Sequence, residues 1–213
     1  MKLSGFAAGP YQTNTYFLTT ETHAVVVDPG MHTADRTVDF LAEHNLELDA
    51  VVLTHGHIDH TRDAGTITRR FGVPAYIHAA DEFMLIDGRG VSPQSRIVFD
   101  ADNMTPIDEV RHLEDGDTLT LLGEEFTIRH APGHSPGSTL LVHEDFALVG
   151  DVIFRGSIGR TDLPQSDPDA MEATLAGPVW ELEDATLLLP GHGPTTTMRA
   201  ERTTNPFLTQ LKR

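Results

Sequence analysis

The feature that most restricts the fold of this chain is a histidine-rich octapeptide that follows an apolar run. Residues 53–60 read Leu-Thr-His-Gly-His-Ile-Asp-His, directly after Ala50-Val51-Val52. A buried strand that ends in such a segment brings several polar side chains to one edge of a sheet. Neutral imidazole and carboxylate are ligands that suit zinc and other first-row divalent metals. The octapeptide therefore predicts a metal site at the end of a strand.

Three later segments repeat this arrangement, each with His or Asp after an apolar run and beside Gly or Pro, which turn the chain sharply. The seven candidate ligands are His55, His57, Asp59, His60, His134, Asp151 and His192. One four-coordinate zinc cannot use so many ligands. Two metals about 3.5–4 Å apart can use them if they share one carboxylate. Asp151 is the natural bridge, because its two oxygens can reach both ions.

The other histidines of the chain are weaker candidates. A single histidine is more often a surface or packing residue than a ligand, and this applies to His23, His32, His44, His112 and His143. His130 is expected to pack behind the site, and His78, at a predicted strand end, is left open.

The pattern of apolar residues indicates the fold class. Strand-like runs at 15–19, 24–27, 50–54 and 75–78 alternate with helical spacing at 33–44, 61–71 and 80–86. The predicted strands 118–122, 125–130, 138–143 and 146–149 follow, then a helix over 167–176 with Asp167 as N-cap, a strand over 186–189 and a helix over 195–204. Residues 87–116, rich in Gly, Pro, Asp and Ser, predict a long loop and a possible lid. This order predicts an α+β fold, an αββα sandwich of two mixed sheets with outer helices, in one domain over 1–213.

Charge and composition restrict the partners. Fifteen Lys and Arg against 32 Asp and Glu give a formal charge of −17, which argues against binding nucleic acid or an anionic membrane. The chain has no cysteine, so disulfides and thiolate metal sites are excluded. The first residues lack a signal-peptide pattern, and no apolar run approaches the ~18 residues that span a bilayer. We expect a cytoplasmic protein.

Thr54 to His60 is similar to the T-H-x-H-x-D-H signature of the metallo-β-lactamase fold, with His134, Asp151 and His192 in the family's order. The segments 130–137 and 150–154 resemble the glyoxalase II group, the hydroxyacylglutathione hydrolases. The run 156–164 and the ending Asn-Pro-Phe-Leu at 205–208 resemble its short, one-domain bacterial members. The resemblance covers essentially the whole chain, and it is more specific for the fold than for the substrate.

This resemblance implies roles for each candidate ligand. His55, His57 and His134 would hold the first metal, and Asp59, His60 and His192 the second, with Asp151 between them. The expected metals are two zinc ions, with iron or manganese as alternatives. A metal-bridging hydroxide would attack the carbonyl of a small-molecule acyl-thioester such as S-D-lactoylglutathione, with Asp59 orienting it and Asp151 holding both ions.

Two departures from the group concern the thiol carrier. Long glyoxalase II enzymes have a C-terminal helical domain that grips glutathione, and this chain ends at residue 213 without it. In those enzymes a basic residue after the bridging Asp contacts the substrate carboxylate. Arg160 occupies that place, either as a substrate contact or as a surface salt bridge, whereas the Tyr two residues later is Asp162 here. The resemblance therefore leaves the thiol carrier open, as it does the oligomeric state.

Other functions fit parts of the pattern. The nearest is an iron-dependent persulfide dioxygenase on the same fold, which uses the counterparts of His55, His134 and Asp151. A lactonase or β-lactamase is a further alternative. A nucleic-acid-processing member is disfavoured by the net charge, and a metal buffer does not explain a seven-residue set that leaves room for a reacting water.

Overall fold

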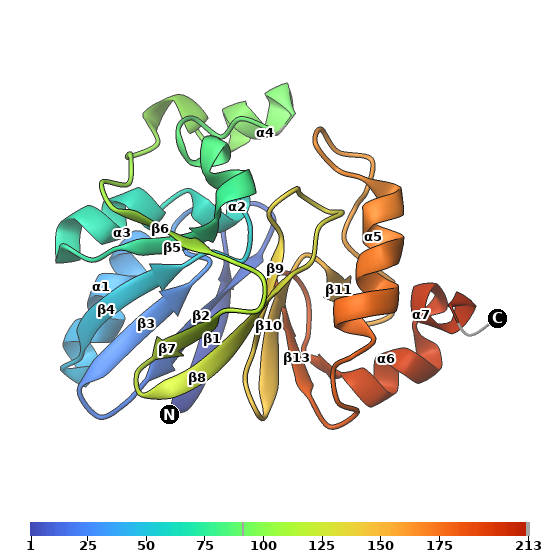
Figure 1. The fold of residues 1–213 in the computed structure, drawn as a ribbon. Coiled ribbons are helices and arrows are strands. Elements are labelled where there is room, and N and C mark those ends of the chain that lie inside the picture. Colours follow the sequence, from blue (N-terminus) through green and yellow to red (C-terminus); the bar gives the residue numbers. More distant parts are fainter. Residues whose placement is uncertain (91, 212–213) are drawn as a thin grey trace.

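Two mixed β-sheets form the centre of the computed structural model, which describes residues 1–90 and 92–211 (Figure 1). The first sheet has the order β1-β2-β3-β4-β5-β6, and its strands are β1 (Lys2–Ala8), β2 (Thr13–Thr19), β3 (His23–Val27), β4 (Glu47–Val52), β5 (Ala75–His78) and β6 (Val110–Leu113). Within it β1, β2 and β3 are antiparallel, and β3 to β6 are parallel.

The second sheet has the order β14-β13-β10-β9-β8-β7. Its strands are β7 (Thr118–Leu121), β8 (Glu124–His130), β9 (Thr139–Val142), β10 (Phe146–Gly150), β13 (Leu187–Pro190) and β14 (Thr196–Thr197). They are antiparallel except for the parallel pair β10 and β13. A small hairpin joins β11 (Ile153–Phe154) to β12 (Ser157–Ile158).

Helices cover the outer faces of both sheets. Figure 1 shows α1 and α3 on the first sheet, and α5, α6 and α7 on the second. The α-helices are α1 (Ala34–His44), α2 (Ile58–Thr61), α3 (Ala64–Phe71), α4 (Pro93–Val98), α5 (Pro168–Thr174), α6 (Met198–Thr204) and α7 (Pro206–Gln210). Shorter helical segments are η1 (Ala79–Leu85), η2 (Ala101–Asn103) and η3 (Leu175–Val179). The predicted αββα sandwich is thus confirmed.

Alternation along the strands explains this layering. Successive side chains of a strand point to opposite faces. In β3, Val25 and Val27 therefore join Phe126 of the second sheet in the inner core, whereas Val26 packs outward with Leu41 of α1. Both faces of β3 are buried, and each such side chain contributes about 1.5–3 kcal/mol.

A separate hydrophobic cluster joins the outer face of the second sheet to the helices that cover it. Ala147 of β10 and Leu188 of β13 pack there against Met171 of α5 and Met198 of α6. The start of α5 agrees with its prediction, because the Asp167 carboxylate accepts hydrogen bonds from the backbone N–H groups of residues 169 and 170 at 2.9 and 3.0 Å.

The sequence prediction differs from the structure in several places, and two of them lie near the cluster of candidate ligands. The helix expected over 61–71 begins only at Ala64, as α3, and the separate short helix α2 precedes it, because the backbone N–H of Asp63 donates to the Pro29 carbonyl at 3.1 Å instead of continuing α2. The loop expected over 87–116 contains α4, η2 and β6, with residue 91 outside the described residues. Exposed Arg111 and His112 interrupt the apolar pattern of β6, which is an edge strand.

Candidate metal centre

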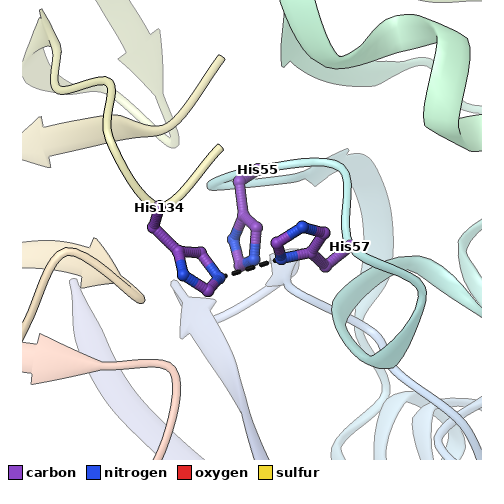
Figure 2. A group of neighbouring side chains, drawn as sticks. All are labelled: His55, His57 and His134. Atoms are coloured by element: carbon purple, nitrogen blue, oxygen red, sulfur yellow. Dashed lines mark hydrogen bonds between the residues drawn. The ribbon is translucent and has the colours of Figure 1, made fainter. Parts of the chain in front are cut away.

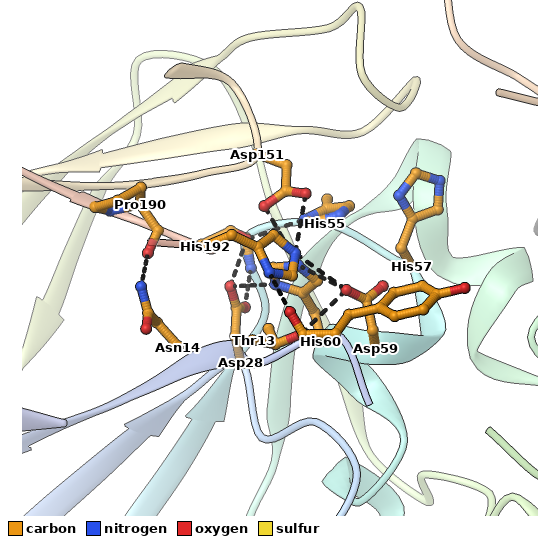
Figure 3. A network of polar contacts seen from close by, with 12 residues as sticks. Thr13, Asn14, Asp28, His55, His57, Asp59, His60, Asp151, Pro190 and His192 are labelled. Carbon is orange, nitrogen blue, oxygen red and sulfur yellow. Dashed lines mark hydrogen bonds and ion pairs between the residues drawn. The ribbon is translucent and has the colours of Figure 1, made fainter. Parts of the chain in front are cut away.

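The candidate ligands lie in loops at one end of the two sheets. His55 and His57 follow β4, and the short helix α2 carries the next two. His134, Asp151 and His192 follow β8, β10 and β13. Because these strands end at the same edge, the structure brings all seven side chains together, as Figures 2 and 3 show.

Three imidazoles form the first cluster (Figure 2). His55, His57 and His134 each offer a nitrogen, and these nitrogens lie within 4.8 Å of one another. The Nδ1 of His57 is 2.8 Å from the Nε2 of His134. All three side chains are buried. Convergent nitrogens at this spacing are an arrangement that one metal ion can occupy.

The second cluster combines a carboxylate with two imidazoles (Figure 3). The Oδ2 of Asp59 lies 3.2 Å from the Nε2 of His192 and 3.5 Å from the Nε2 of His60. The Thr13 hydroxyl donates to the same oxygen at 3.1 Å and fixes its position.

Asp151 lies between the two clusters. Its Oδ2 is 3.5 Å from the Nε2 of His134 and 3.4 Å from the Nε2 of His192. Its Oδ1 is 3.4 Å from the Nε2 of His60. One carboxylate thus reaches imidazoles of both clusters.

Outer hydrogen bonds orient the imidazoles. The Nδ1 of His60 donates to Asp28 Oδ2 at 2.9 Å, which turns its Nε2 toward Asp151. Similarly, the Nδ1 atoms of His134 and His192 donate to the carbonyl oxygens of residues 160 and 11. Such outer partners fix the ring orientation of metal-ligating histidines. Asp28 also accepts from the backbone N–H and hydroxyl of Thr54, so its carboxylate is held by three hydrogen bonds beside His55 and His60, with which it also forms a group that could hold a metal ion.

Asp81, in η1, is a functional candidate that the sequence analysis missed. Its buried carboxylate accepts from the backbone N–H of Gly56 at 2.8 Å, the hydroxyl of Ser135 at 2.6 Å and the backbone N–H of Gly137 at 2.6 Å. These residues neighbour ligands of the first cluster. The two glycines pack so closely on Asp81 that a Cβ at either position would collide with it. The only signal in the sequence was an aspartate shortly after a predicted strand.

Charge divides the imidazoles into two kinds. Burial, together with the neighbouring histidines, lowers the pKa of His55 well below its usual value, and burial and His134 lower the pKa of His57 to about 3. These two rings are therefore neutral and present lone pairs without releasing a proton, which is the form that binds metal.

The other ionisable groups form a charge network. Burial opposes the charged form of His60, but Asp59, Asp151 and Asp28 outweigh it and raise its pKa well above the usual value. Likewise, burial lowers the pKa of His192, while Asp151 and Asp59 raise it to about 9. Burial raises the pKa of Asp59, but His60 and His192 bring it down to about 2, and the pKa of Asp151 falls well below its usual value for the same reason. The carboxylates are ionised, and a cation is strongly favoured between them.

Unpaired polar atoms test whether a metal fits. The Nε2 atoms of His55 and His60 and the Oδ1 of Asp151 are buried and make no hydrogen bond within the described residues. Buried polar groups without partners are rare because they lose their hydration. Divalent cations would satisfy these atoms, so the donor set fits a metal site.

A cavity of about 830 Å³ opens above this centre. His57, Asp59, Asp151 and His192 form part of its floor. Its walls include Gly90, Ser92, Gln94 and Ser95 on one side and Phe154, Ile158, Arg160, Asp162, Leu163 and Pro164 on another. Arg160 lines the cavity, with its guanidinium paired to Asp162. Figure 1 shows α4 and the loop that leads into α5 at the same end of the molecule.

The remaining histidines lie elsewhere. His78 and His130 stack on each other with ring centroids 4.1 Å apart, and His130 donates to the Pro136 carbonyl at 2.8 Å. His130 therefore has the packing role that was expected. His23 and His112 pair with exposed carboxylates. Over residues 1–90 and 92–211, no helix combines the length and the apolar character needed to cross a membrane.

Comparisons with known proteins agree with this geometry. The family model of the metallo-beta-lactamase superfamily matches residues 8–192. The chain is 34% identical to the hydroxyacylglutathione hydrolase GloC of Haemophilus influenzae, over 88% of each chain. A crystal structure of the BLEG-1 B3 metallo-beta-lactamase is 33% identical with a TM-score of 0.86, over 98% of this chain and 100% of that one. The structure of TTHA1623 in a di-iron-bound form is 34% identical with a TM-score of 0.80, over 96% and 100%.

Seven metal-type ligands at one sheet edge and a family match over most of the length lead to one conclusion: the chain belongs to the metallo-beta-lactamase superfamily.

Proposed function

We propose that this protein is a thioester hydrolase that uses two divalent metal ions. One observation carries the proposal: Asp151 lies within 3.5 Å of imidazoles from both clusters, beneath an open cavity. The similarity to the hydroxyacylglutathione hydrolase GloC of Haemophilus influenzae supports a thioester as the bond that is cleaved.

In this proposal each cluster holds one ion. His55, His57 and His134 hold the first, Asp59, His60 and His192 hold the second, and Asp151 serves both. Zinc is the expected metal, because imidazole and carboxylate suit it and hydrolysis needs no redox change. Iron is the alternative, since these ligands accept it too and TTHA1623 was solved with two irons.

When bound, the metals supply Lewis acidity and lower the pKa of a water molecule toward neutrality. The protein positions the reactants. The ionised Asp59, fixed by Thr13, lines the cavity floor, where it orients the attacking water and accepts its hydrogen bond. A thiol has a pKa of about 8.5, so the thiolate leaves without a strong general acid.

β-Lactam hydrolysis is the second candidate function, because BLEG-1 is a B3 metallo-beta-lactamase that superimposes over nearly the whole chain. The iron-dependent dioxygenase is less favoured. It would need only His55, His134 and Asp151, and it leaves the convergence of Asp59 with two further imidazoles without a purpose.

The test measures turnover and metal content on the same preparation. Acyl-thioesters including S-D-lactoylglutathione, a β-lactam, a lactone and a glutathione persulfide are compared. We expect thioesters to give the highest kcat/KM, and both Asp59→Asn and His134→Ala to lower it by about 100-fold. His112→Ala, an exposed histidine paired with Glu82, is the matched control. Faster turnover of the β-lactam or the persulfide would refute the proposal.

A further inference from the structure

The cavity above the metal centre has a largely apolar wall. Five of its lining residues expose rings or hydrocarbon side chains, and they are Tyr11, Phe154, Ile158, Leu163 and Pro164. They come from the loop before β2, from the β11–β12 hairpin and from the segment after it. Apolar groups of a substrate gain free energy on such a surface in proportion to the area removed from water.

Only one lysine or arginine, Arg160, is among the described residues that line this cavity. Its Nε donates to Asp162 Oδ1 at 2.8 Å, and its Nη2 donates to Asp162 Oδ2 at 3.0 Å. A guanidinium binds a carboxylate with this same fork of two donors. A substrate carboxylate would therefore have to displace Asp162 to take this fork, and at the remaining Nη donors it would lie beside the charge of Asp162.

Two further arginines near the cavity are already paired with carboxylates. Arg89 and Arg96, which flank the wall residues Ser92 and Gln94, pair with Asp87, and Arg96 also pairs with Asp102. The formal charge of the chain is −17, so the long-range field disfavours the approach of anions.

We propose that this cavity selects thioesters whose acyl and thiol groups are apolar and uncharged, and that Asp162 disfavours substrate carboxylates by holding the Nε–Nη2 fork of Arg160 and balancing its charge. The inference rests on the proposed thioester hydrolysis and names its substrate class. Asp162 touches no reacting atom, so its role is to determine specificity. A carboxylated thioester meets a guanidinium whose charge Asp162 already balances, whereas an uncharged one meets hydrocarbon.

The experiment uses two thioesters that differ only in charge. The S-acyl thioesters of N-acetylcysteine and of N-acetylcysteinamide carry a carboxylate and an amide at the same position. The metal-loaded protein is assayed with both, and kcat and KM are determined separately. We expect the kcat/KM of the amide to be about fivefold higher, because an exposed charge pair changes an equilibrium by about this factor. The difference should appear in KM and not in kcat.

Two variants show whether Asp162 causes the preference. Asp162→Asn frees the guanidinium, and we expect it to raise the carboxylate-to-amide ratio of kcat/KM by about three- to fivefold. The double variant with Arg160→Gln should lose this gain, because the gain requires the freed guanidinium. The control is Asp108→Asn, which removes the same charge from the exposed fork of Arg69 and Asp108 and should leave the ratio as in the wild type.

Binding is measured as a second readout, independent of turnover. Calorimetry with the S-propyl thioethers of N-acetylcysteine and its amide should show tighter binding of the amide. In Asp162→Asn the carboxylate-to-amide ratio of the binding constants should rise, as the ratio of kcat/KM does. If no thioester is hydrolysed, the proposed function fails, while the calorimetric ratio still decides the inference. A wild-type preference for the carboxylate, or an equal shift with Asp108→Asn, would overturn the role of Asp162.

Discussion

Asp81 provides the most informative test of how the protein holds its first cluster in place. This carboxylate joins the loop that carries His55 and His57 to the loop that carries His134, through three hydrogen bonds. Replacing it with Asn keeps the shape but turns one acceptor into a donor. Replacing it with Ala removes both acceptors.

The size of the effect follows from these contacts. In Asp81→Ala the backbone N–H groups of Gly56 and Gly137 lose their acceptor, whereas Ser135 keeps the Ser138 hydroxyl at 2.7 Å. A buried donor left unpaired costs about 1–3 kcal/mol, so we expect the free energy of unfolding to fall by about 2–6 kcal/mol. Asp81→Asn, with its amide oxygen at the Oδ2 position, still accepts from Gly56 and Ser135 and leaves only the Gly137 N–H unpaired, so it should lose about 1–3 kcal/mol. Both should weaken metal binding by about 10- to 100-fold, as disrupted outer support does.

Urea unfolding of the chelator-treated protein measures the stability, and competition with a chromophoric chelator measures the metal affinity. Asp115→Asn is the control, because Asp115 also accepts a backbone N–H, that of His130, but is exposed. Its effect on stability should stay within about 0.5 kcal/mol. Wild-type metal affinity in Asp81→Asn, at any stability, would show that Asp81 does not position the ligands.

Two further predictions concern a glycine of the site and a surface histidine. Gly191→Ala should weaken metal binding at least tenfold in the same competition assay, because its methyl group would overlap Asp151 Oδ1 and His60 Cε1. The control is Gly177→Ala, which has open space beside it, and equal metal affinities of the two variants would contradict this packing argument. The hydrogen bond from His23 to Asp49 raises the pKa of His23, so Asp49→Asn should lower that pKa toward 6.5 in an NMR titration. Since the folded pKa is raised, the stabilisation is complete below pH 6.5 and is lost as the pH rises through the folded value; an unchanged pKa would refute the pairing.

The convergence of the candidate ligands could be predicted because side-chain chemistry and strand ends are local features of a sequence. His55 and His57 follow a continuous apolar run, and His134, Asp151 and His192 each follow one beside Gly or Pro. Parallel strands such as β10 and β13 end at the same edge, so side chains far apart in sequence meet there. Most strands of the two sheets could also be predicted from the local sequence, because they are rich in Val, Leu and Ile.

Features that depend on backbone pairing or on long-range contacts were not predictable. The strand β1 is largely exposed and lacks an apolar run, and it is held by its antiparallel register with β2. Asp28 follows a predicted strand directly before Pro29-Gly30, and only the folded structure brings it to the Nδ1 of His60. Asp81 and the Arg160–Asp162 pair likewise acquire meaning only from their neighbours in space.

The most direct test of the central claim is a titration of zinc into chelator-stripped protein, with thioester hydrolysis followed at each addition. The clusters around Asp151 predict that the stripped protein is inactive and that activity rises to a plateau at two zinc ions per chain. Hydrolysis that persists in the stripped protein, or zinc binding at this stoichiometry without turnover of any thioester, would contradict the account.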